Sequence, residues 1–156
     1  MDHPMTLIGK KMIEDELNHL IRVEREQLKI EISEARDLGD LKENAEYHAA
    51  KEKQSLLEGR IMDLQGKLGR AMVIDITNLK SNKIVFGATA TLFDTQKDTE
   101  VTYQIVGEDE AMSDPKKISY NSPLGKAMIG KEVGDEVIVK APKGDIVYEV
   151  QKITYV

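Results

Sequence analysis

Residues 47–68 read YHAAKEKQSLLEGRIMDLQGKL, a stretch in which seven positions recur at alternating intervals of three and four residues. These positions are Tyr47, Ala50, Gln54, Leu57, Ile61, Leu64 and Leu68. A mean interval of roughly 3.5 residues is typical of the seam of a coiled coil, here with one polar position at Gln54. The sequence therefore predicts a long helix that packs against a partner helix along this seam.

A second apolar stripe precedes the first. It consists of Ile13, Leu17, Ile21, Leu28, Ile32 and Ala35. The stripe is interrupted at Glu24–Arg25, where another seam residue is due. Gly39 lies between the two stripes, and a glycine can adopt the left-handed conformation that ends a helix. The short connection predicts two antiparallel helices of about 25 residues each, which form a rod about 35–40 Å long. Such a rod serves either as an oligomerisation element or as a probe that enters a narrow space.

From residue 72 onward the apolar residues alternate, as in half-buried strands. The predicted strands are Met72–Ile76, Ile84–Phe93, Glu100–Val106, Lys117–Tyr120, Glu136–Lys140 and Ile146–Ile153. One short helix is expected among them, because Ser122 suits a helix N-cap, Pro123 the first helical position and Gly130 the helix end.

These patterns predict an α+β protein with two domains. The first is an N-terminal antiparallel coiled-coil hairpin over residues 1–76, with its tip at about residues 37–44. The second, over residues 77–156, is an antiparallel sheet domain with one short helix.

The composition excludes several classes of protein. The 156 residues include no cysteine, which excludes disulfides, thiolate catalysis and cysteine-ligated metal sites and fits a reducing cytoplasm. The net charge is −6 and neither half is basic, so binding to naked nucleic acid is not expected as the main activity. No apolar run approaches the roughly 20 residues of a membrane span, and Met1–Pro4 lacks the basic start of a secretory signal. We therefore expect a cytoplasmic protein that has no membrane partner.

Two acids, Asp40 and Glu43, lie three residues apart where the second helix is expected to start. One interpretation is a capping box that stabilises the helix by about 1 kcal/mol. The other is that two carboxylates at an exposed tip supply hard oxygen ligands for Mg²⁺. Two ligands cannot hold Mg²⁺ alone, so a functional tip would have to complete a site on a partner. The interpretations are compatible, because a helix N-terminus favours ionised carboxylates.

The run Gly39–Ala50, GDLKENAEYHAA, closely resembles the hairpin tip of the Gre family of transcript cleavage factors. Further matches to the family are Glu58–Ile61, Ile84–Thr89, Tyr103–Gly107, Asn121–Pro123 and Ile129–Lys131. The resemblance spans nearly the whole chain in order. It implies a coiled-coil hairpin followed by a C-terminal domain of FK506-binding-protein-like (FKBP-like) fold that docks on polymerase.

The resemblance also implies a role in transcription. Gre factors bind bacterial RNA polymerase, and their hairpin enters its secondary channel toward the active centre. There they stimulate the polymerase's own cleavage of the nascent RNA 3′ end in backtracked complexes, which rescues arrested transcription. Asp40 and Glu43 match the family's tip acids, which are implied to help hold a second, weakly bound Mg²⁺ and the attacking water. The chain would then be an accessory factor, with no cofactor of its own beyond Mg²⁺ shared with the polymerase, and is expected to act as a monomer.

Further candidates flank the tip acids. Asn44 and Tyr47 are predicted to support the tip, either by orienting the acids or simply as a cap residue and a seam residue. The candidate RNA contacts are Arg36, Lys42 and Lys51. The alternative for these cations is pairing with neighbouring glutamates at helical spacing.

The resemblance assigns the polymerase contact to a segment of the second domain. That segment is Asn121, Ser122 and Pro123. The alternative is that Ser122 and Pro123 merely start a helix.

Two rival functions remain. The first is prolyl isomerase activity, which an FKBP-like fold would suggest. That activity needs an aromatic-lined pocket, and the second domain has no Trp and only two Phe. The other rival is a Gre-fold homologue that occupies the channel without stimulating cleavage. Such a homologue would have an altered tip, whereas this tip is intact.

Overall fold

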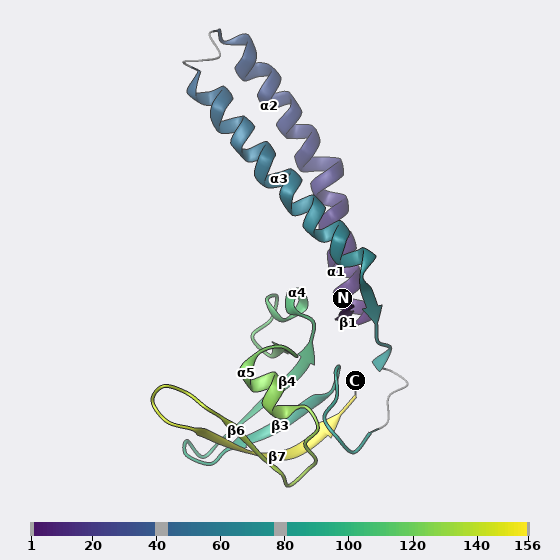
Figure 1. The fold of residues 1–156 in the computed structure, drawn as a ribbon, viewed down its shortest axis with the longest axis vertical. Coiled ribbons are helices and arrows are strands. Elements are labelled where there is room, and N and C mark those ends of the chain that lie inside the picture. The colour runs from purple at the N-terminus through teal and green to yellow at the C-terminus, as the bar shows by residue number, and fades with distance from the viewer. Residues whose placement is uncertain (1, 40–43, 77–80, 156) are drawn as a thin grey trace. The chain divides into compact units, whose positions relative to one another are not determined.

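The structure is a computed structural model that describes residues 2–39, 44–76 and 81–155. The chain forms two compact units (Figure 1). One unit is Lys11–Arg70, and the other combines Met1–Lys10 with Ala71–Val156.

The units divide the chain differently from the predicted domains, 1–76 and 77–156. The reason is an unpredicted strand, β1 (His3–Met5), which pairs in parallel with β2 (Ala71–Val73). This pairing joins the start of the chain to the segment that follows the hairpin. Because strand β2 ends at Val73, the strand predicted over Met72–Ile76 is shorter than expected.

The hairpin unit contains two long helical segments that lie side by side (Figure 1). The first runs through α1 (Leu7–His19), a π-helical turn η1 (Leu20–Glu24) and α2 (Arg25–Asp37). The second is α3 (Ala45–Gly69), with 25 residues. Gly39, beyond the end of α2, has a φ of +127°, a backbone conformation that favours glycine. The predicted pair of helices joined near Gly39 is confirmed.

The two predicted stripes form the core of the hairpin. The buried side chains are Ile13, Leu20, Leu28, Ile32, Ala35, Ala50, Ile61 and Leu64. Leu28, Ile32 and Ala50 form one cluster, against which Tyr47 and Leu57 pack. Leu20 is buried where Ile21 was expected, at the start of the π-helical turn. The predicted seam residues Leu17, Gln54 and Leu68 are only partly buried.

The sheet unit is built on five strands in the order β5-β4-β3-β7-β6. They are β3 (Thr89–Asp94), β4 (Thr99–Val106), β5 (Lys117–Ser119), β6 (Glu136–Val139) and β7 (Ile146–Thr154). All neighbours are antiparallel except β4 and β5, which are parallel, so the prediction of a wholly antiparallel sheet is corrected at this edge. The buried core is Ile84, Ala88, Ala90, Leu92, Ile105, Met128, Val137 and Val150.

Strand β3 starts five residues later than predicted because of Gly87. This glycine has a φ of +91°, and a Cβ atom there would lie 2.1 Å from Cγ2 of Ile76. Ile84 is nevertheless fully buried, so its apolar character reflects core packing rather than strand structure.

Two short helices accompany the sheet, rather than one. The predicted helix is α5 (Pro123–Met128), capped by Ser122 and followed by Gly130 with a φ of +90°. The second is α4 (Glu108–Ala111), a single turn without a side-chain cap. Among the helices of the described residues, none has the length and hydropathy of a membrane span.

Candidate functional site

The tip of the hairpin is described only on its two flanks. Asp40, Lys42 and Glu43 lie outside the described residues, so their predicted roles rest on sequence and on what flanks them. The flanks are the end of α2 and Asn44, the residue that precedes α3.

Asn44 is the N-cap of α3. Its backbone is extended, with φ −86° and ψ 92°, and its side-chain Oδ1 accepts a hydrogen bond from the backbone N–H of Tyr47 at 3.0 Å. The second helix therefore begins at Ala45, not at the tip acids as expected from sequence. The N-cap role that a capping box would assign to Asp40 belongs in α3 to Asn44.

Asn44 also joins the two helices. Its side-chain Nδ2 donates a hydrogen bond to the carbonyl oxygen of Ala35, near the C-terminal end of α2. Helix ends leave unpaired N–H and C=O groups, and this amide pairs with one group from each helix. We call this pair of hydrogen bonds the tip clamp. It gives the tip-supporting role predicted for Asn44 a physical basis.

Tyr47 lies between the tip and the core. It packs against the cluster around Ala50, and its ring lies 5.7 Å from that of His48 in an edge-on arrangement. The guanidinium carbon of Arg36 is 6.0 Å from the centroid of the Tyr47 ring, within the range of a cation–π contact. Arg36 is thereby held beside the tip from the opposite helix while it stays exposed.

Lys51 is exposed on α3, and its Nζ donates to Oε1 of Gln54 at 2.9 Å. Of the three candidate RNA contacts, the structure thus describes Arg36 and Lys51. Among the described residues, no group of three or more His, Asp or Glu side chains is arranged to hold a metal ion.

Two substitutions at Asn44 separate the halves of the tip clamp. Asn44→Asp keeps the cap acceptor but loses the donor to Ala35, whereas Asn44→Ala loses both. We expect the free energy of unfolding to fall by about 0.5–1 kcal/mol for the first and about 1–2 kcal/mol for the second. Urea unfolding followed by helical circular dichroism measures both values. Equal losses would show that the bond to Ala35 contributes nothing.

The segment predicted to dock on polymerase starts α5. Oγ of Ser122 accepts from the backbone N–H of Gly125 at 3.0 Å and donates to the carbonyl of Ser119 at 2.7 Å. Pro123 occupies the first helical position and is exposed. Asn121 is also exposed, and its Nδ2 donates to Oε1 of Glu108 at 3.2 Å. Ser122 therefore has a structural role, while Asn121 and Pro123 present exposed side chains.

The sheet unit contains a buried acid that was not predicted from the sequence. Glu110, on α4, is only 2% exposed. It accepts a hydrogen bond from the hydroxyl of Thr6 and pairs with Nζ of Lys117 at 2.9 Å. Oγ1 of Thr6 in turn accepts from the N–H of Gly9 at 3.0 Å, so it caps the start of α1. Nothing in the sequence distinguishes Glu110 from the acids beside it, because only the fold buries it.

Two cavities of the sheet unit bear on the prolyl isomerase alternative. One, of about 520 Å³, is lined by Gln96 and residues 141–146. The other, of about 180 Å³, is lined by residues 6–8, residues 74–76 and Gln104. Neither lining includes the aromatic side chains that a proline-binding pocket would need. These cavities give that alternative no support.

Comparisons with known proteins define the family. The profile described as "Transcription elongation factor, N-terminal" matches residues 3–73, and the one described as "Transcription elongation factor, GreA/GreB, C-term" matches residues 79–155. The chain therefore belongs to the GreA/GreB family of transcription elongation factors.

Curated relatives are similar over almost their whole length. The transcription elongation factor GreA of Francisella philomiragia is 52% identical, with 97% of this chain and 96% of the relative covered. That of Ruthia magnifica is 54% identical, with 98% of both chains covered. Both relatives are named GreA, in agreement with a sequence that resembles GreA more closely than GreB. A solved structure of GreA factor homolog 1 from Thermus thermophilus is 26% identical, with 99% of both chains covered and a TM-score of 0.40.

Proposed function

We propose that the protein binds bacterial RNA polymerase, inserts its hairpin into the secondary channel and stimulates cleavage of the RNA 3′ end in backtracked complexes. The observation that carries the proposal is the sequence GDLKENAEYHAA at the connection of a two-helix hairpin, together with the tip clamp that joins the described residues Ala35, Asn44 and Tyr47 on its flanks. The polymerase performs the chemistry, and this factor contributes groups to its active centre. Cytoplasmic action as a monomer is part of the proposal.

The proposed chemistry at the tip is metal-assisted phosphodiester hydrolysis. Asp40 and Glu43 would supply carboxylate oxygens, the ligands that Mg²⁺ prefers, and the polymerase the remaining ligands. A second metal ion stabilises both the attacking and the leaving oxygen of an in-line displacement. Because Asn44 caps α3, the helix does not need Asp40 as its N-cap. This supports the catalytic interpretation of the two acids over the capping box.

Cations beside the tip fit a role in guiding the extruded RNA. Arg36 is held against Tyr47 from α2, and Lys51 is exposed one helical turn beyond Tyr47 on α3. With Lys42, these residues would contact phosphates of the RNA 3′ segment. Such contacts are sequence-independent and weaken as salt is raised.

A direct test uses purified polymerase stalled in a backtracked state on a labelled transcript. Addition of the factor should shorten the RNA from its 3′ end, and a gel resolves the products. Unchanged RNA in complexes to which the factor is demonstrably bound would favour the rival in which a homologue occupies the channel without stimulating cleavage.

Docking on the polymerase is proposed for Asn121, Ser122 and Pro123 of the sheet unit. Pro123→Glu tests this with little structural cost, because an acid in the first turn of a helix is favoured by the helix dipole. We expect Pro123→Glu to bind polymerase at least about tenfold more weakly than wild type in a competition assay. This corresponds to a loss of about 1.4 kcal/mol of binding free energy. Gln151→Glu is a matched control, since it adds one negative charge at an exposed position on β7. Wild-type affinity for Pro123→Glu would refute the docking assignment.

A further inference from the structure

The first long helix carries one residue more than a regular seam allows. Its buried residues Ile13 and Leu20 are seven apart, whereas Leu20 and Leu28 are eight apart. The extra residue is taken up by η1, because a π-helical turn contains more residues than an α-helical one. The backbone on both sides is ordinary α-helix, with φ −63° at His19 and −60° at Arg25. The π-turn thus keeps Leu28 on the same face of the helical segment as Ile13 and Leu20.

Arg25 stands at the seam position that follows the π-turn, where the apolar stripe is interrupted. Its Nε donates to Oε1 of Glu58 at 2.8 Å, and its Nη2 donates to Oε2 at 2.7 Å. Both side chains are half-buried, at 30% and 41% exposure. The hydrogen bonds to Glu58 raise the pKa of the Arg25 guanidinium above its usual value, which favours its charged form. This bidentate ion pair, which we call the Arg25–Glu58 fork, therefore occupies a place in the seam where an apolar contact is expected.

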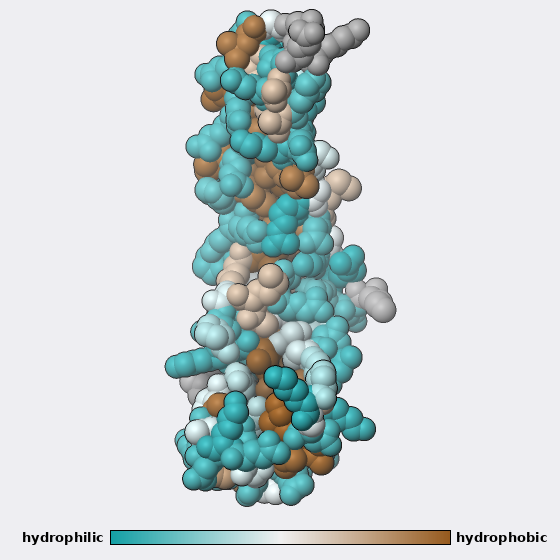
Figure 2. All heavy atoms as spheres, turned by 90° about the vertical axis from the view of Figure 1, so that its left-hand side faces the viewer, coloured by the Kyte–Doolittle hydropathy of each residue, from teal (hydrophilic) through white to brown (hydrophobic). Residues whose placement is uncertain are grey.

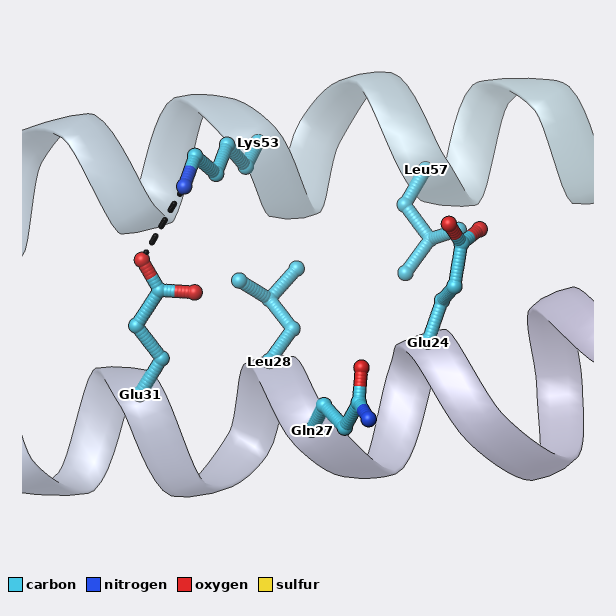
Figure 3. A pocket seen from close by; sticks show the side chains of 6 residues that line it. All are labelled: Glu24, Gln27, Leu28, Glu31, Lys53 and Leu57. Atoms are coloured by element: carbon cyan, nitrogen blue, oxygen red, sulfur yellow. Dashed lines mark hydrogen bonds and ion pairs between the residues drawn. The ribbon is translucent and has the colours of Figure 1, made fainter.

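An open groove lined largely by polar side chains lies beside this fork. A cavity of about 280 Å³ lies between the helices, and Figure 3 shows Leu28 and Leu57 directed into the space between the two ribbons. The Lys53–Glu31 pair bridges the helices beside it, through a single contact of 3.1 Å between exposed side chains. Figure 2 shows one side of the hairpin, where hydrophilic side chains predominate and apolar patches lie between them. Apolar contact between the helices thus runs here through Leu28 and Leu57, with polar side chains around them.

On the other side of the π-turn, a second fork joins the same helices with opposite polarity. Nε and Nη2 of Arg60 donate to the two carboxylate oxygens of Glu16, each at 3.0 Å. On α3, Glu58 thus pairs with Arg25 after the π-turn, whereas Arg60 pairs with Glu16 before it. The residues one turn from Glu58 on α3 are Gln54, Ser55, Ile61 and Met62. None of them is acidic, so a shifted alignment would leave Arg25 without a carboxylate on α3.

We propose that the Arg25–Glu58 fork, set beside the π-turn, is a register lock that fixes the axial alignment of α2 against α3 and so positions the tip. A polar pair at an otherwise apolar seam can specify register at a cost in stability. A slip of one turn would move the helices by about 5.4 Å relative to each other. Arg25 and Glu58 are thus positioning residues. The inference rests on the proposed function for its effect on cleavage, but not for its effect on the hairpin.

The test removes the fork without leaving a lone charge. In Arg25→Met with Glu58→Leu, apolar side chains replace both partners, so we expect a thermal midpoint equal to or above that of wild type. The exchanged pair, Arg25→Glu with Glu58→Arg, is the matched control that restores a fork. The chain has no cysteine, so spin labels can be attached specifically to the introduced cysteines of Glu34→Cys and Ala49→Cys. Both positions are exposed and lie between the fork and the tip of the hairpin. Distances between these labels report the register.

We expect one narrow distance distribution for wild type and for the exchanged pair, and a broadened or shifted one for the apolar pair. The cleavage rate at saturating factor should then fall about tenfold for the apolar pair, while the factor concentration that gives half-maximal cleavage stays unchanged. The reason is that misplaced tip carboxylates slow the chemical step and not the docking on polymerase. A wild-type distribution for the apolar pair would overturn the lock. A shifted distribution with wild-type cleavage would overturn its role in positioning. If wild-type factor stimulates no cleavage, the proposed function fails, while the label distances still test the lock.

Discussion

Asp40→Asn should lower the single-turnover rate of RNA cleavage in a backtracked complex by at least about tenfold at saturating factor, an increase of ~1.4 kcal/mol in the barrier. The loss follows because an amide oxygen carries no charge and binds Mg²⁺ more weakly than a carboxylate. Glu43→Gln should behave in the same way. Binding to polymerase should change little, since docking is proposed for the other unit.

The cleavage rate separates this prediction from the capping interpretation. Asn caps helices about as well as Asp, so a pure capping role for Asp40 predicts a nearly silent change. In addition, α3 has its own cap at Asn44. Matched controls lie just outside the tip: Asp37→Asn at the end of α2 and Glu46→Gln in the first turn of α3, both exposed. These variants make the same chemical changes and should retain near-wild-type cleavage.

Glu110→Ala should cost about 3 kcal/mol of unfolding free energy in the sheet unit. The substitution removes the acceptor for the Thr6 hydroxyl and leaves the ammonium of Lys117, 21% exposed, without its carboxylate. Urea unfolding of the full chain, followed by tyrosine fluorescence, measures the loss, because four of the five tyrosines lie beyond residue 100.

The control is Glu108→Ala, at an exposed position on the same short helix. Its side chain accepts an exposed hydrogen bond from Asn121, so we expect a loss below about 1 kcal/mol. Equal losses for the two variants would mean that the buried contacts of Glu110 do not stabilise the unit.

The parts of the fold that follow from local chemistry were predictable. The seam through Ala50, Ile61 and Leu64 is regular, and helical periodicity alone indicates which side chains are buried. The helix after Ser122 was equally readable, because a cap residue, a proline at the first position and a terminating glycine each have a local cause.

The parts that depend on distant contacts were not predictable. The single turn α4 has no capping signal, and its Glu110 is an ordinary acid until Thr6 and Lys117 surround it. Strand β1 is three residues long, and its partner lies more than sixty residues away in β2. The interruption at Arg25 was visible, but its meaning needed the partner Glu58 on the other helix.

Two residues near the start of the second helix were candidates for its N-cap. Asp40 and Asn44 are both good cap residues, and sequence spacing favoured the first because an acid follows three residues later. The structure selects Asn44, whose amide also reaches the carbonyl of Ala35 on the opposite helix. A cap residue that bonds both helices satisfies more backbone groups than one that bonds its own helix alone.

In the proposed mechanism, the tip acids share a Mg²⁺ ion with the polymerase. The rate of RNA cleavage in a backtracked complex, measured at saturating factor across a Mg²⁺ series, tests this sharing. The measurement compares wild type, Asp40→Asn and Glu43→Gln with the controls Asp37→Asn and Glu46→Gln. We predict that the two tip variants need more Mg²⁺ for half-maximal cleavage and recover part of their rate as Mg²⁺ is raised, while the controls follow wild type. Tip variants with the same Mg²⁺ dependence and rate as wild type would contradict the claim.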